Sequence, residues 1–278
     1  MNGICKLCRC EKKLQKSHYL PQSLYKAVAN TNSSSSESLV HVNRPKKETF
    51  SSDRQQKKYL LCADCEQLFS KKGETAVAGG CYKNDGQFTL RSQLESIAPS
   101  FTSPDGENHY YGKELDSLIS SQDYIYFALS VVWRGSVGVW GESYNALSGA
   151  LGDKYSELFR QYLLNPTHPP KKTAVIAYVD FDSPSQMGMF ASPTTSGKRT
   201  SVAGSRVYEV MIPGIFFSIM VGGDIDKMLT SSSVPDRIMF NEWSFTESPQ
   251  YRDIVTITQA SSVRGKLADQ LSNYAKAE

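Results

Sequence analysis

Two pairs of cysteines with the same spacing constrain the fold of this chain more than any other feature. Cys5 and Cys8 form the first pair, and Cys62 and Cys65 form the second, each as Cys-x-x-Cys. A turn of this kind lets two thiolates reach one ion, and two such turns complete the tetrahedral shell that Zn²⁺ prefers. The sequence therefore predicts a structural Zn²⁺ site made of these four residues.

The two pairs are far apart in the chain, so the predicted site closes a long loop. Metal binding offsets the entropy of closure, because that entropy rises only slowly with loop length. Cys10 lies close to the first pair and is a spare or substitute ligand. Cys81 stands alone, and we interpret it as a small apolar residue of the core.

The remaining composition indicates a globular protein without a membrane segment. Hydrophobic residues make up 40% of the 278 residues, which is enough for one large core or two ordinary ones. We find no apolar run of about 18 residues that could cross a bilayer, and the N-terminus is charged where a signal peptide is apolar. We expect a cytoplasmic protein, in which paired cysteines bind metal more often than they form disulfides.

The basic residues are concentrated in the first 75 residues. This segment carries 14 Lys and Arg against 7 Asp and Glu, while the remainder carries 17 against 21. Such asymmetry is typical of a region that meets a polyanion, and DNA is the partner we expect. Residues 30–58 are serine-rich and basic, and we interpret them as a flexible insertion; a solvated linker is the alternative. The side chains predicted to contact phosphates are Arg44, Lys46, Lys47, Arg54, Lys57 and Lys58.

The pattern after residue 75 predicts a mixed α+β body spanning residues 76–278. A Gly-rich turn is expected near residues 76–80, followed by a helical hairpin over about 113–165. The first helix ends near Gly135, where Arg134 would complement the helix dipole. Residues 172–258 are rich in β-branched and aromatic residues, which predicts antiparallel strands, and about 260–276 predict a C-terminal helix. A protein partner could bind this body, whose role the sequence does not assign.

The N-terminal motif resembles a known family. The elements are a Cys-x-x-Cys pair, a His-x-x-Pro string at residues 18–21, and a second pair preceded by apolar residues and followed by a helical pattern. This combination is similar to the zinc-stapled branch of the HNH (ββα-metal) endonucleases, and it covers about residues 3–75. The resemblance implies a small ββα-like zinc module.

The resemblance also implies catalytic roles. His18 falls at the position of the general base that activates water for attack on a phosphodiester bond, a task that suits a neutral imidazole. The family uses a divalent metal, here expected to be Mg²⁺ or Mn²⁺, to stabilise the leaving oxygen. Other readings of His18 are an additional zinc ligand or a partly buried residue that caps a turn.

The chain departs from the family at the metal ligands. Ser17 replaces the acid that usually precedes the histidine, Glu66 replaces the histidine after the second pair, and the family's middle asparagine has no clear counterpart. Glu66 could present oxygen to a hard cation, and Glu74 lies about two helical turns further on. The alternative is that Glu66 only complements the N-terminal dipole of its helix.

These observations lead to two functional hypotheses. The first is a metal-dependent HNH-like endonuclease that hydrolyses DNA, with RNA as a less favoured substrate; the resemblance implies a setting in phage defence or mobile-element biology. The second is a non-catalytic zinc-binding adaptor for nucleic acid or protein. Cleavage that depends on His18 distinguishes the first from the second.

Overall fold

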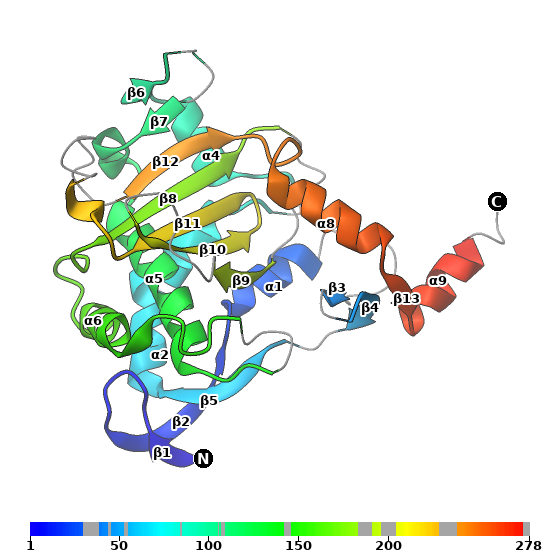
Figure 1. Cartoon of the computed structure of the whole chain (residues 1–278), viewed down its shortest axis with the longest axis horizontal. Coiled ribbons are helices and arrows are strands. Elements are labelled where there is room, and N and C mark those ends of the chain that lie inside the picture. The colour runs from blue at the N-terminus through cyan, green and yellow to red at the C-terminus, as the bar shows by residue number, and fades with distance from the viewer. Residues whose placement is uncertain are drawn as a thin grey trace.

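The computed structural model describes residues 1–29, 39–43, 46–52, 55–83, 85–104, 106, 109–141, 146–182, 191–195, 204–227 and 238–274. Helices and strands both contribute to its packed core, which confirms the predicted α+β class (Figure 1). Among these residues, no helix has the length and apolar character needed to cross a bilayer.

The N-terminal module is a three-stranded antiparallel sheet followed by a helix. Its strands are β1 (Asn2–Ile4), β2 (Glu11–His18) and β5 (Lys57–Cys62), in the order β1-β2-β5. Helix α2 (Ala63–Phe69) begins directly after β5 and buries Cys65 and Phe69. Two paired strands followed at once by a helix agree with the expected ββα-like arrangement.

The helix that follows the second cysteine pair continues further than the sequence indicated. After α2 the chain forms one π-helical turn, Ser70–Glu74, and then α3 (Thr75–Gly80). The predicted Gly-rich turn near residues 76–80 is therefore wrong. There is little room for a side chain at Gly80, because a Cβ there would lie 2.1 Å from the hydroxyl of Tyr124.

The body is built on a seven-stranded mixed sheet with the order β6-β7-β12-β8-β11-β10-β9. Most neighbours are antiparallel, but β12 pairs with β8 in parallel, so the expectation of purely antiparallel strands is wrong for this pair. The strands are β6 (Phe101–Thr102), β7 (His109–Tyr111), β8 (Thr173–Asp180), β9 (Ala191–Thr195), β10 (Arg206–Ile212), β11 (Ile215–Val221) and β12 (Ile238–Trp243).

Helix α5 (Ser121–Val137) lies against one face of this sheet and is buried along almost its whole length. It packs against α6 (Gly152–Leu164), in agreement with the predicted helical hairpin. A 3-10 turn, Lys113–Ser117, precedes α5 in the chain. Helix α5 does not stop at Gly135. This glycine lies where Tyr19 of the module approaches, and a Cβ there would lie 2.4 Å from the Tyr19 hydroxyl.

One hydrophobic core joins the module to the body. Buried residues from Cys5 and Leu7 at one end to Phe240 at the other belong to the same cluster, with α5 among them. The backbones of the two parts come close at Gly73, where α5 crosses the π-helical turn. Described residues on both sides of residue 75 therefore share one core, although the sequence changes character there.

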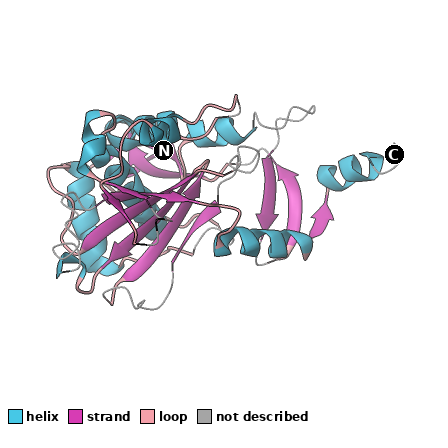
Figure 2. Ribbon diagram, turned by 90° about the horizontal axis from the view of Figure 1, so that it is seen from above, coloured by secondary structure: helices cyan, strands magenta, loops and turns pink. Residues whose placement is uncertain are grey.

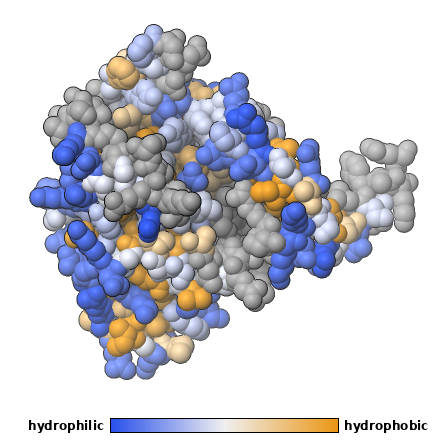
Figure 3. Space-filling model, viewed as in Figure 1, coloured by the Kyte–Doolittle hydropathy of each residue, from blue (hydrophilic) through white to orange (hydrophobic). Residues whose placement is uncertain are grey.

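The C-terminal segment forms an arm that returns to the N-terminal insertion. Strands β3 (Leu39–Asn43) and β4 (Glu48–Ser52) pair within the insertion, and β13 (Ser262–Arg264) adds to β4 in parallel. Figure 2 shows this small sheet projecting from the large one, together with helix α9 (Lys266–Tyr274). Helix α8 (Pro249–Gln259) leads into the arm; it has no buried residue and exposes both hydrophilic and hydrophobic side chains (Figure 3).

Two sequence predictions fail in or near this arm. The predicted C-terminal helix over 260–276 is a strand and a shorter helix, separated by Gly265 at φ +58°. The β-rich part, expected to reach 258, ends with β12 and is followed by α8. Within the insertion over 30–58, the described residues include the paired strands β3 and β4. Helix α4 (Thr89–Glu95) lies between α3 and β6 in the chain, and helix α1 (Gln22–Ala29) follows β2 in the module.

The crossing at Gly73 generates a stability prediction. A Cβ at this position would lie 2.8 Å from the amide nitrogen of Phe127 and 2.9 Å from the carbonyl oxygen of Asp123, and neither backbone atom can rotate away. We expect Gly73→Ala to lower the free energy of unfolding by about 1–3 kcal/mol. Gly79→Ala is the control, because a Cβ there meets nothing within 4 Å and alanine favours the helix. Urea unfolding of both variants measures the difference; equal stability of the two would contradict the proposed close crossing.

Candidate metal centre and nucleic-acid interface

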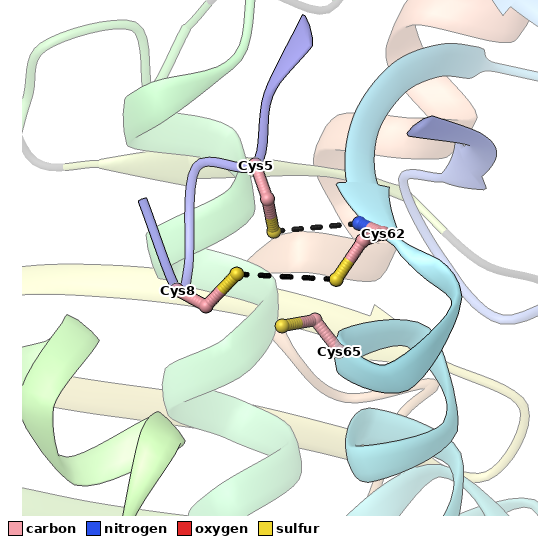
Figure 4. Close-up of side chains that lie close together, drawn as sticks. All are labelled: Cys5, Cys8, Cys62 and Cys65. Carbon is pink, nitrogen blue, oxygen red and sulfur yellow. Dashed lines mark hydrogen bonds between the residues drawn. The ribbon is translucent and has the colours of Figure 1, made fainter. Parts of the chain in front are cut away.

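The four cysteine sulfurs converge on one point. The Sγ atoms of Cys5, Cys8, Cys62 and Cys65 all lie within 4.8 Å of one another, and Figure 4 shows them pointing toward a common centre. The Sγ atoms of Cys8 and Cys62 are 3.9 Å apart. Four sulfurs at about 2.3 Å from a tetrahedral Zn²⁺ would be separated by roughly 3.8 Å. The sequence prediction of this ligand set is therefore consistent with the geometry, and the cluster could hold a metal ion such as Zn²⁺.

The first pair lies on a tight turn between β1 and β2. The amide of Arg9 donates to the carbonyl of Cys5 (2.9 Å), and the amide of Cys5 donates to the carbonyl of Cys10 (3.0 Å). Arg9 adopts φ +62°, a left-handed conformation that reverses the chain. From the body, Arg160 of α6 donates to the carbonyl of Leu7 (2.6 Å), so the body helix also holds this turn in place.

The second pair lies at the junction of β5 and α2. The amide of Cys62 donates to the Sγ of Cys5 (3.3 Å), which is how backbone dipoles stabilise thiolate charge in such sites. Cys10 is exposed and lies outside the four-sulfur group, so it is a spare thiol in this structure. Cys81 is fully buried in the core, as its isolated position in the sequence predicted.

The chemistry of these thiols suits a metal centre. Burial raises the pKa of the Cys65 thiol strongly, and the neighbouring Cys62 and Cys5 act in the same direction. Buried thiolates crowded together are unfavourable without a cation, whereas a bound Zn²⁺ deprotonates its thiol ligands and neutralises their charge. The donor set therefore fits a soft-to-borderline ion of the zinc type.

A second cluster lies inside the module, behind the metal centre. The hydroxyl of Ser17 on β2 donates to the carboxylate of Glu66 on α2, and it also accepts from the amide of Leu61 (3.2 Å). Ser17 is almost fully buried. Ser17 and Glu66 stand at the two positions where the HNH resemblance implies metal ligands. Their side chains are hydrogen-bonded to each other. Burial raises the pKa of Glu66, which the Ser17 hydrogen bond partly opposes.

Arg134 of helix α5 enters the same interior from the body. Its side chain is only 1% exposed, and its Nη2 lies 2.8 Å from the Oε1 of Glu74. Its Nη1 donates to the carbonyl of His18 (3.0 Å), and its guanidinium lies over the ring of Phe69, 5.2 Å from the centroid. The sequence prediction for Arg134 was only that it complements the helix dipole, although an arginine within the apolar run of α5 is itself a signal of a buried partner.

The outer face of the β2–β5 ribbon carries a different set of side chains. Residues opposite each other in an antiparallel pair share a face, and neighbours along a strand alternate. Lys16 is opposite Tyr59, and His18 is opposite Lys57. We call these four residues the outer ribbon face. The lysines and Tyr59 are exposed, His18 is half-buried, and the Lys16 ammonium lies 5.8 Å from the centre of the Tyr59 ring.

A hydrogen bond and a ring contact hold His18 on this face. Its Nε2 is hydrogen-bonded to the Oε1 of Gln55 (2.9 Å), and its ring lies 6.3 Å from that of Tyr25. Burial lowers the pKa of His18, and the charges of Lys57 and Arg134 lower it further. Because Ser17 faces the interior, alternation along β2 places the imidazole on the side opposite Glu66. Alternation thus separates His18 from Glu66, while the charge of Glu74 still acts on His18 and raises its pKa.

The interior acids do not fit a hard divalent cation as they lie. The Glu66 carboxylate is bonded to Ser17, and that of Glu74 is paired with Arg134. Across the described ranges, the four cysteines are the one group of His, Cys, Asp and Glu side chains placed to hold an ion. Mg²⁺ or Mn²⁺ at Glu66 and Glu74 stays a prediction of the family resemblance, and no chemical step is assigned to it here.

The predicted phosphate contacts have different positions. Lys57 lies on the outer ribbon face, whereas Lys58 faces the other way and donates to the carbonyl of Val139 (3.1 Å). Lys46 and Lys47 are exposed at the turn of the β3–β4 hairpin. Arg44 and Arg54 lie outside the described residues. Lys16 and Tyr59 were missed, because only the strand register brings them beside His18 and Lys57.

Comparisons with protein-family models, with curated proteins and with solved structures found no match to this chain.

The metal centre generates a direct prediction. We expect the purified protein to contain one Zn²⁺ per chain, and Cys62→Ser to lose it and to be destabilised, because three thiols and a hydroxyl form a much weaker site. Elemental analysis measures the zinc content and thermal unfolding the stability. Cys10→Ser and Cys81→Ser serve as controls that keep the metal. Full zinc content in Cys62→Ser would show that the ion is bound elsewhere.

Proposed function

We propose that the N-terminal module binds nucleic acid, preferably DNA, through the outer ribbon face. The observation that carries this proposal is the register of β2 and β5, which places Lys16, His18, Lys57 and Tyr59 together on an accessible surface. Lysines supply affinity for phosphates that does not depend on sequence, and an exposed tyrosine ring is a stacking surface for an unpaired base.

Charge and rigidity of the module support this role. The segment that contains the ribbon carries a surplus of seven positive charges over its 14 Lys and Arg and 7 Asp and Glu, while the rest of the chain has a net negative charge. The metal centre fixes the strands at the end of the ribbon where Cys62 lies. A surface that is already in place before binding loses less entropy when the ligand arrives.

Binding through this face has a measurable salt dependence. We expect Lys16→Gln and Lys57→Gln each to weaken binding of a single-stranded DNA oligonucleotide and to reduce the slope of log K against log salt by about 0.7–0.9. Tyr59→Ala should weaken binding by about 1–3 kcal/mol without changing that slope, since stacking carries no counterion release. Fluorescence anisotropy at several salt concentrations measures both quantities.

Lys171→Gln is the matched control, because this exposed lysine lies in the body, just before β8. It should bind DNA as the wild type does. Binding that is insensitive to salt, or equally reduced by Lys171→Gln, would contradict the outer ribbon face as the interface.

A second candidate function, HNH-like endonuclease, is favoured by one specific observation. His18, the family's general base by position, lies on the same face as Lys16 and Lys57, so a phosphate bound by these lysines would be next to the imidazole. Burial lowers the pKa of His18, which favours the neutral imidazole that a base requires, and the hydrogen bond to Gln55 orients the ring. If the module has no catalytic activity, it is the zinc-binding adaptor of the second hypothesis.

His18→Ala separates the two candidates. If the protein is an endonuclease, nicking of supercoiled plasmid with Mg²⁺ or Mn²⁺ should fall about 100-fold or more in His18→Ala, while zinc content and DNA affinity are retained. The wild-type rate should increase as His18 loses its proton and level off below the usual imidazole pKa of about 6.5. Cleavage by a clean His18→Ala preparation at the wild-type rate would eliminate the HNH-like mechanism, and no cleavage by the wild type would leave the adaptor.

A further inference from the structure

The interior of the module already contains a positive charge. The carboxylate of Glu74 pairs with Arg134 at 2.8 Å, and Glu66 lies one helical turn before Phe69, on whose ring the same guanidinium rests. Arg134 also donates to the carbonyl of His18, the neighbour of the Ser17 that holds Glu66. The guanidinium therefore contacts Glu74 and the backbone of His18, and its charge lowers the pKa of Glu66; these are the three residues to which the sequence assigned the catalytic site.

The manner in which Arg134 is held indicates a charge fixed for its electrostatic effect. Its Nη2 lies 3.4 Å from the hydroxyl of Ser130 on the preceding turn of α5, and Phe69 supports the planar group from one side. Its Nε has no hydrogen-bond partner, and the contact with Glu74 is an ion pair whose angles do not make a hydrogen bond. A guanidinium stays charged even when buried, so it neutralises acids without a bound ion.

We propose that Arg134 replaces the divalent cation of an HNH-like module, so that the body of this protein supplies to the module, as a side chain, the charge that the family takes from a metal. Glu66 and Glu74 are then partners of an internal cation rather than ligands awaiting Mg²⁺ or Mn²⁺. The inference concerns the interior face and is independent of whether the outer ribbon face binds nucleic acid.

Manganese binding tests this directly, since Mn²⁺ is visible by electron paramagnetic resonance and can be titrated without any activity assay. The zinc-loaded wild type and Arg134→Lys, which keeps a positive charge, should bind no Mn²⁺ that depends on Glu66. Arg134→Ala removes the charge and leaves space beside two carboxylates, so it should gain one Mn²⁺ site and a melting temperature that rises with added Mn²⁺. Arg134→Ala/Glu66→Gln should lose that site.

Two results would overturn the proposal. One is a stoichiometric Mn²⁺ site in the wild type that Glu66→Gln abolishes, because the interior would then hold a metal with Arg134 present. The other is a folded Arg134→Ala protein that binds no Mn²⁺. If Arg134→Ala does not fold, the comparison of wild type with Glu66→Gln still decides, since it needs neither variant of Arg134.

Discussion

The convergence of four thiols is the constraint on which the module depends. It brings the turn after β1 to the junction of β5 and α2, two segments that are far apart in the chain. Once that junction is fixed, β5 pairs with β2, with a shift of register between Leu14 and Lys16, and α2 leaves the sheet at the angle that brings Glu66 onto Ser17. The outer ribbon face follows from the same register, so the interior cluster and the exposed basic surface are two consequences of one arrangement.

The body makes direct contacts with the interior of this module. Helix α5 crosses the π-helical turn at Gly73, where the backbones touch, and Arg134 extends from the same helix to Glu74 and to the carbonyl of His18. A buried guanidinium with an acidic partner is costly to separate, because either charge left alone in the interior would be uncompensated. Module and body are therefore coupled through their core, and the arm adds a distant link by pairing β13 with the β3–β4 hairpin.

The sequence predicted what is encoded locally. The cysteine spacing identified the ligand set, and the periodicity of the body identified the helical pair and most strands of the large sheet. It failed where pairing over long distances decides the outcome. Val263 belongs to a strand because β4 is there to pair with it, and Arg134 is an internal partner because the module lies against α5. The sequence assigned His18 and Glu66 to one site. Ser17 faces the interior and contacts Glu66, so alternation along β2 turns the neighbouring imidazole of His18 to the outer face.

We propose that the outer ribbon face, rather than the acidic body, binds the nucleic acid. Ultraviolet cross-linking of a bromodeoxyuridine-containing DNA strand to the full-length zinc-loaded protein, followed by peptide mapping, tests it most directly. We predict cross-links in the peptide that contains Tyr59, and their loss when the metal is removed by a chelator. Cross-links confined to residues 76–278, or a Tyr59 cross-link that persists unchanged after removal of the metal, would contradict the account.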